Sequence, residues 1–183
     1  MKPSVLLAVS LAFALSACAC AAQSPFAVTT DDAVDGRFAQ AQYYNNYGCT
    51  GGNISPHITW SGAPADTQSY AVTVFDPDAP TGHGWWHWLV TDIPATTTGL
   101  ERGISGTNGL QPLGIVETNN DFGTGTYGGP CPPPGQDHHY VITVYALKTV
   151  KLGLAPETPP AEVEKALKAA AAATATTTVM AAR

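Results

Sequence analysis

The chain has 183 residues, of which 8 are Lys or Arg and 14 are Asp or Glu, so its formal net charge is -6. So few cations argue against binding to nucleic acid, because affinity for the phosphate backbone depends on clustered Lys and Arg side chains. A hydrophobic content of 44% argues against an intrinsically disordered chain, and 18 Gly with 15 Pro favour a loop-rich β protein over a helical bundle. The length fits a single domain.

Residues 1–22 are typical of a secretory signal peptide rather than of a folded segment. Lys2 is followed by an apolar run over residues 5–15, and small residues come after that run. A positive start, a short apolar stretch and a small-residue end are the three parts of such a signal. Residues 23–183 are therefore predicted to be the folded part, a single domain.

Two cleavage sites remain open. The run Leu15-Ser16-Ala17-Cys18 resembles a bacterial lipobox, in which Cys18 receives lipid and becomes the first residue of the mature protein. Ordinary cleavage near Ala22 is the alternative, and it is favoured by the fact that lipobox processing would leave Cys20 as an extra cysteine. We favour the lipoprotein. Both routes place the protein in the bacterial cell envelope, in the periplasm, and the lipid on Cys18 would be its only attachment to the membrane.

Two cysteines remain in the body of the chain, Cys49 and Cys131, and both lie in stretches rich in Gly and Pro. The periplasm is an oxidising compartment in which disulfides persist. We therefore hypothesise a disulfide between these two residues. It would close a loop of about 80 residues and stabilise the fold by about 4 kcal/mol in the chain-entropy model.

Several strands are predicted from β-branched, aromatic and alternating residues that end at Gly or Pro. They cover residues 26–28 (an edge strand), 58–60, 69–75, 86–93 and 140–147. The segment 69–75 is almost entirely apolar, which favours burial on both faces. Simple alternation in the segment 86–93 places His87 and Leu89 on one face and Trp88 and Val90 on the other.

One helix is predicted near the C-terminus. Thr158 can cap it, Pro159 suits its first turn, and the apolar spacing from Val163 to Ala170 is helical. The Ala-rich run over residues 169–175 has high helix propensity, and the three threonines after it fray this helix or continue it weakly. Two long Gly-rich stretches, residues 99–114 and 123–135, are predicted loops.

Polar residues gather in two stretches, residues 76–88 and 127–140. In both, an acid or a histidine lies at the end of an apolar strand, beside loops that contain several prolines. Such positions direct side chains into a cleft from a rigid base.

The chain resembles bacterial phosphatidylethanolamine-binding proteins of the Raf kinase inhibitor-like group. The matching segments are residues 48–56, 76–80, 85–88, 120–123 and 127–140. The resemblance covers the chain from about Phe26 to its C-terminus. It implies a mainly β fold, a β-sandwich with a large central sheet, a small second sheet and peripheral helices including a C-terminal one.

The same resemblance implies a small anion pocket that accepts phosphate and phosphorylated head groups. Carried over position by position, the pocket residues are Asp76, Pro80, His87, Gly129, Pro132, His138 and Tyr140. His139 stands where the family usually has Arg. This departure puts in doubt any cationic contribution at the rim of the pocket.

The residues themselves favour the same pocket. His138 and Tyr140 are two positions apart, so both face one side of a strand, and His87 is expected to approach from the neighbouring strand. Histidine and tyrosine can donate to an oxyanion. Asp76 can orient a histidine or accept a hydrogen bond from an amine, which suits a zwitterionic head group.

The glycines of the stretch 127–140 are also predicted to contribute to anion binding. Successive backbone N–H groups at Gly128 and Gly129 are expected to form an anion-binding concavity. No Lys or Arg is predicted at the site. Affinity should therefore be modest and should increase as the pH falls toward the pKa of histidine.

Structural interpretations of some of these residues stay open. Asp76 can cap a turn, and His87 can be a core histidine between tryptophans. Trp85, Trp86 and Trp88 are interpreted as core and pocket-wall residues rather than as a platform for a sugar.

The sequence thus predicts a non-catalytic binding protein without cofactor or metal, whose partner is phosphate or a phosphorylated small molecule or lipid head group. One alternative is a secreted inhibitor-like protein that acts on a peptidase or a kinase through a loop surface such as residues 99–114. A second alternative is a metalloenzyme with Asp76, His87 and His138 as its two-histidine, one-carboxylate site.

Overall fold

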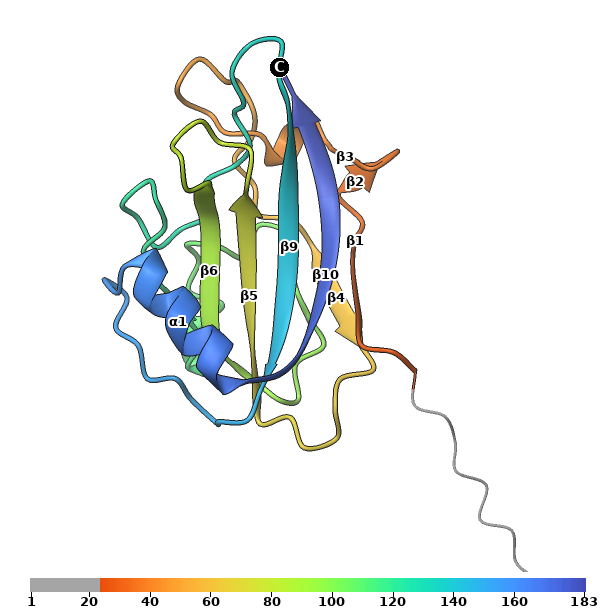
Figure 1. Cartoon of the computed structure of the whole chain (residues 1–183), viewed down its shortest axis with the longest axis vertical. Coiled ribbons are helices and arrows are strands. Elements are labelled where there is room, and N and C mark those ends of the chain that lie inside the picture. The colour runs from red at the N-terminus through yellow and green to blue at the C-terminus, as the bar shows by residue number, and fades with distance from the viewer. Residues whose placement is uncertain (1–23) are drawn as a thin grey trace, which may run out of the picture.

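The computed structural model describes residues 24–183. The predicted signal peptide and the lipidation site Cys18 lie outside the described residues. Two β-sheets pack together, and one α-helix lies on the outer face of the larger sheet (Figure 1). The large sheet has the strand order β2-β3-β10-β9-β5-β6-β8, and the small sheet has the order β1-β4-β7. The predicted combination of a large central sheet with a small second sheet is confirmed.

The strands of the large sheet differ greatly in length. They are β2 (Ala33–Val34), β3 (Arg37–Phe38), β5 (Ser69–Asp76), β6 (Trp85–Pro94), β8 (Val116–Glu117), β9 (Asp137–Leu147) and β10 (Ala171–Ala182). The small sheet consists of β1 (Ala27–Thr30), β4 (Ile58–Ser61) and β7 (Gly99–Leu100). The helix is α1 (Pro160–Ala170), and two short 3-10 turns are η1 (Gln40–Gln42) and η2 (Gln111–Leu113). All five predicted strands are present, and β1 is the predicted edge strand.

Strand β5 lies at the centre of the large sheet and pairs antiparallel with β9 on one side and β6 on the other. One face of these strands forms the core between the two sheets, where Val72 and Trp88 are fully buried. On the other face Ala71 and Leu89 pack beneath Leu167 of α1. Burial on both faces explains why β5 is apolar at nearly every position, as predicted.

The C-terminal segment differs from the prediction. Helix α1 ends at Ala170, and residues 171–182 form β10, which pairs antiparallel with β9 along almost its whole length. The ladder with β9 and the burial of Val179 and Ala181 outweigh the high helix propensity of the alanines, and the threonines are β-branched residues that suit a strand. The predicted Thr158 cap is also wrong, because the N-cap position is Pro159 and no side chain caps the helix. No helix within residues 24–183 is long and apolar enough to cross a bilayer.

Strand β6 carries two irregularities, and the first of them positions the site. Trp86 pairs with Phe75 and Trp88 pairs with Val74, so His87 is an extra residue in the ladder. Such a bulge turns a side chain that alternation would send to the other face. His87 therefore faces the same side of the sheet as Trp88, whereas Leu89 lies under α1. The predicted sharing of a face by His87 and Leu89 is wrong for this reason.

Candidate functional site

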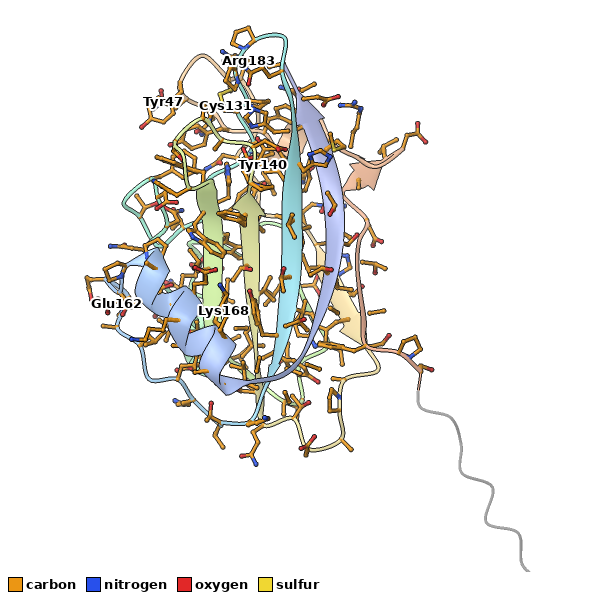
Figure 2. The ribbon with its side chains drawn as sticks, viewed as in Figure 1. Tyr47, Cys131, Tyr140, Glu162, Lys168 and Arg183 are labelled. Atoms are coloured by element: carbon orange, nitrogen blue, oxygen red, sulfur yellow. A yellow bond between two sulfur atoms is a disulfide. The ribbon has the colours of Figure 1, made fainter. Side chains whose placement is uncertain are left out.

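A cavity of about 270 Å³ opens where β5 ends and where β6 and β9 begin. Figure 2 shows Tyr140 and Cys131 toward the end of the molecule that lies away from Glu162 and Lys168 of α1. Six of the seven predicted pocket residues line this cavity together: Asp76, Pro80, His87, Pro132, His138 and Tyr140. The fold thus brings these residues together, and their binding of a ligand stays a prediction.

The innermost polar groups are Asp76 at the end of β5 and His138 on the adjacent strand β9, and both are buried. Nδ1 of His138 lies 2.8 Å from Oδ2 of Asp76, and since a carboxylate only accepts, this nitrogen carries the hydrogen. The backbone N–H of Asp78 donates to Oδ1 of Asp76 at 2.8 Å. Asp76 therefore caps the turn after β5 and orients a histidine of the cavity, so both of its predicted roles are found.

His87 presents a single free ring nitrogen to the cavity. Its Nδ1 donates to the carbonyl oxygen of Gly128 at 2.6 Å, which leaves Nε2 as the other polar atom of the ring. The ring lies edge to face against Tyr140, with 5.0 Å between the centroids. Strand β5 lies between β6 and β9, so His87 does not come from the strand next to Tyr140 as predicted; the bulge brings the two rings together.

Burial lowers the pKa of His87 below its ordinary value of 6.5, and the bond to Gly128 and the charge of Asp76 oppose this only in part. His87 is therefore neutral at neutral pH, with Nε2 as an acceptor. Burial is also the main reason that the pKa of Tyr140 is raised, and the nearby Asp76 carboxylate adds to it. The phenol of Tyr140 stays protonated and donates to Asp76.

The lowered pKa of His87 predicts a loss of stability in acid. Between the folded pKa and 6.5 the unfolded chain binds a proton that the folded chain does not, so stability is fully present above pH 6.5 and falls as the pH drops below it. The expected slope from this group is at most about 1.4 kcal/mol per pH unit. Urea unfolding from pH 7.5 to pH 5 should show this slope reduced in the H87N variant.

His83 provides the control for that measurement. It is an exposed histidine between two glycines, in the turn between β5 and β6, and it does not line the cavity. The H83N variant should keep the slope of the parent protein. A slope that falls equally in both variants would show that His87 is not the group responsible.

Gly129 does not line the cavity, and the predicted concavity of N–H groups at Gly128 and Gly129 is wrong. The N–H of Gly128 donates to the carbonyl oxygen of His87 at 3.0 Å, and the N–H of Gly129 donates to Oδ1 of Asn53 at 2.7 Å. Neither N–H is left for an anion. Gly129 is instead needed for packing, because a Cβ there would lie 2.0 Å from the carbonyl oxygen of Gln42.

His139, which stands where the family usually has Arg, faces away from the cavity. It pairs with Asp78, and Nδ1 of His139 lies 2.7 Å from Oδ2 of Asp78. Hydrogen bonds from His139 lower the pKa of Asp78. None of the cavity-lining residues within the described part of the chain is Lys or Arg. The doubt about cationic help at the rim is therefore supported by the structure.

The predicted disulfide between Cys49 and Cys131 is present in the structure, and it joins residues 82 positions apart. Cys131 lines the cavity, and the bridge ties its loop to the loop that carries Tyr47, another lining residue. The guanidinium of Arg183 lies over the bridge, with Nη1 3.4 Å from Sγ of Cys49 and 3.6 Å from Sγ of Cys131. One wall of the cavity is thus covalently fixed.

The arrangement does not favour the metalloenzyme alternative. Within residues 24–183 no group of three or more His, Cys, Asp or Glu residues is placed to hold a metal ion. Nδ1 of His138 is already bonded to Asp76, and Nδ1 of His87 is bonded to a backbone carbonyl.

Comparison with known proteins agrees with the fold. The family model described as phosphatidylethanolamine-binding protein matches residues 29–182. The chain belongs to the phosphatidylethanolamine-binding protein family.

Two Escherichia coli relatives of this phosphatidylethanolamine-binding protein are UPF0098 protein YbcL and UPF0098 protein YbhB. YbcL is 49% identical over 130 residues, which are 69% of this chain and 71% of YbcL. YbhB is 44% identical over 119 residues, which are 64% of this chain and 75% of YbhB. The crystal structure of YbcL, described as a member of the mammalian PEBP family, matches with a TM-score of 0.83 at 44% identity, over 87% of this chain and 99% of that one.

A more distant match is the putative phosphatidylethanolamine-binding protein homologue CT736 of Chlamydia trachomatis. Its crystal structure gives a TM-score of 0.69 at 25% identity, over 86% of this chain and 97% of that chain. The predicted family and the predicted fold are therefore both confirmed.

Three aromatic residues of this phosphatidylethanolamine-binding protein line the cavity but were not predicted as binding residues: Tyr47, Trp85 and Phe122. The sequence indicates Trp85 only as a core or pocket-wall residue, and in the structure it lines the cavity wall, whereas Trp88 is fully buried in the core. Phe122 belongs to the segment 120–123 that resembles the family, and this resemblance is the one feature of the sequence that could have indicated a role in the site. Tyr47 lies just before a matching segment and offered none.

Proposed function

We propose that this chain is a non-catalytic periplasmic binding protein whose cavity takes phosphate or a phosphorylated head group together with a proton on His87. The observation that carries the proposal is the free Nε2 atom of His87, since Nδ1 is fixed to the Gly128 carbonyl at 2.6 Å. Protonation turns Nε2 from an acceptor into a charged donor that faces the ligand.

The other polar groups of the cavity support an anion only in part. The oxygens of Asp76 already accept from the N–H of Asp78 and from His138, which reduces their repulsion of a negative ligand. Ala79, Cys131 and Trp85 line the cavity, and among the described residues no hydrogen bond is made by the backbone N–H groups of the first two or by the indole N–H of Trp85. The Tyr140 phenol already donates to Asp76, so it is these three N–H groups that are suited to phosphate oxygens.

Binding of the anion and binding of the proton must favour each other equally, because linkage is reciprocal. The ligand raises the lowered pKa of His87, and acid therefore raises the affinity for the ligand. The affinity rises as the pH falls from the pKa of His87 in the complex to its pKa in the free protein, which lies below 6.5, and levels off below the latter. At neutral pH we expect modest affinity, as the sequence predicted.

Glycerophosphoethanolamine is the probe of choice, because a phosphodiester lacks the second ionisation of a phosphate monoester near pH 6. Titration calorimetry from pH 7.5 to pH 5.5 should show affinity rising as the pH falls, by at most about tenfold per pH unit for one linked proton. The H87N variant can still donate to Gly128 but does not titrate, so its affinity should be lower in acid and nearly independent of pH. The H83N variant should behave like the parent protein.

Two results would overturn the proposal. The first is an absence of amide shifts near His87 and Tyr140 when millimolar phosphate or glycerophosphoethanolamine is added. The second is an affinity that rises equally in acid for the parent protein and for H87N.

The predicted alternative of an inhibitor-like protein receives less support. Residues 99–114 do not form a free loop, because Oε2 of Glu117 accepts the N–H of Gly106 at 2.9 Å and Oε1 accepts the hydroxyl of Ser105. Trp88 in the core donates to the same carboxylate at 2.6 Å. The segment is therefore anchored to the sheet at Ser105 and Gly106, whereas residues 107–109 and 111–113 are exposed.

A further inference from the structure

The disulfide between Cys49 and Cys131 borders two cavities. Cys131 lines the cavity described above, whereas Cys49 lines a second cavity of about 310 Å³ together with Arg183. Figure 2 shows Cys131, Tyr47 and Arg183 at the same end of the molecule. A small molecule in the first cavity therefore meets the bridge at Cys131.

The two cysteines differ in accessibility. Cys49 is buried, with 6% of its surface exposed, whereas Cys131 is half-buried. Thiol–disulfide exchange begins when a thiolate attacks one sulfur of the bridge and the other sulfur leaves. Access therefore favours attack on Sγ of Cys131, with Sγ of Cys49 as the leaving atom.

The groups around the bridge favour the same direction. Nη1 of Arg183 lies 3.4 Å from Sγ of Cys49, and a guanidinium stabilises a thiolate that forms beside it. The same nitrogen lies 3.6 Å from Sγ of Cys131, but that sulfur also lies 3.7 Å from the carbonyl oxygens of Asn46 and Tyr47. These oxygens carry partial negative charge, which disfavours a thiolate on Cys131. Cys49 is therefore the better leaving group.

Arg183 is held over the bridge by two further contacts. Its Nη1 donates to the carbonyl oxygen of Tyr47 at 3.2 Å, and its own carbonyl oxygen accepts the N–H of Gly135 at 2.7 Å. No Asp or Glu side chain within residues 24–183 forms an ion pair with Arg183. The charge of the guanidinium is thus available to the sulfurs.

We propose that Cys131 is a site of S-thiolation by a low-molecular-weight thiol, and that Arg183 promotes the reaction by stabilising the thiolate of Cys49. The thiol first gives its proton to water. Its thiolate then forms a new S–S bond with Cys131, and the bond to Cys49 breaks with its electron pair on Sγ of Cys49. The sulfur of the incoming thiol is oxidised and Cys49 is reduced. The inference stands apart from the proposed function, since no step involves an anion in the cavity.

This exchange would change the cavity. The adduct would stand on Cys131 in the cavity wall, and the loop that carries Tyr47 would lose its covalent tie to that wall. The bridged and the thiolated forms of the protein would therefore present different cavities to a ligand.

Glutathione is a suitable probe. The purified protein is incubated under native conditions with millimolar glutathione, quenched in acid and treated with N-ethylmaleimide, which labels free thiols. Peptide mapping at early times should find glutathione on Cys131 and maleimide on Cys49. The rate should be proportional to the glutathione concentration, because the thiolate attacks the folded protein directly.

Variants of Arg183 test its part in the reaction. R183Q should slow the exchange about three- to tenfold, because the leaving thiolate loses its cation. R183K keeps the charge and should retain most of the rate. R37Q is the matched control, because Arg37 pairs with Asp137, and its rate should equal that of the parent protein. Urea unfolding checks that each variant is folded.

Several results would overturn the inference. They are an absence of adduct, an adduct mainly on Cys49, equal rates for R183Q and the parent protein, and a rate that does not depend on the glutathione concentration. The last would mean that the bridge reacts only after the protein opens. The proposed function is tested separately, by titration with the anion in the absence of thiol.

Discussion

Replacing Cys49 and Cys131 together by serine is expected to lower the free energy of unfolding by about 4 kcal/mol. The bridge joins residues 82 positions apart, so its loss restores a large loop entropy to the unfolded chain. It also frees the cavity wall at Cys131 from the loop that carries Tyr47, so affinity for a head group should fall at the same time. Urea unfolding of the parent and the double variant measures the first effect.

Reduction supplies the control, because no cysteine other than these two follows residue 20 of the chain. Dithiothreitol should destabilise the parent protein to the level of the double variant and should leave the double variant unchanged. A difference between parent and variant below about 1 kcal/mol would contradict the role that we assign to the bridge.

The second large effect is expected from G129A, which should cost roughly 3 kcal/mol. A Cβ at this position would stand 2.0 Å from the carbonyl oxygen of Gln42 and 2.6 Å from the nitrogen of Tyr44, and both are backbone atoms that cannot rotate away. Hydrogen bonds hold the two segments close together, since the N–H of Gly129 donates to Oδ1 of Asn53 and the N–H of Tyr44 donates to the carbonyl oxygen of Pro130. Thermal unfolding measures the loss.

G135A is the matched comparison. Nothing lies within 4 Å of a Cβ at Gly135, but its φ is 77°, so alanine there brings backbone strain of about 1 kcal/mol without a clash. The smaller loss of stability expected in G135A distinguishes the cost of a steric clash from the cost of backbone strain. Equal losses in the two variants would show that the close approach to Gln42 and Tyr44 relaxes easily.

Much of the site follows from local sequence patterns. The apolar run of β5 ends at Asp76, and His138 and Tyr140 alternate on β9, so the spacing alone places an acid, an imidazole and a phenol on one side of two strands. Both strands form as predicted, because tertiary packing and local propensity agree there. The pairing of the two strands then brings Asp76 to His138.

The features that were missed depend on partners far away in the sequence. The bulge at His87 is defined by how β6 pairs with β5, and no local sequence pattern predicts it. The N–H of Gly129 is taken by Asn53, which lies 76 residues earlier. Strand β10 consists of good helix formers at its start, and only the ladder with β9 makes it a strand.

The extra residue in β6 has a consequence for how such a protein can change over generations. Removing one residue at position 87 would remove the first of the two irregularities between β6 and β5 and make the pairing regular at this point. The same deletion would remove the carbonyl of His87, which accepts from Gly128 and Asn120, together with the imidazole that the proposed ligand needs. A single-codon loss at this point would therefore cost the ligand its binding group and the fold these hydrogen bonds, so the irregular pairing is expected to persist as this protein evolves.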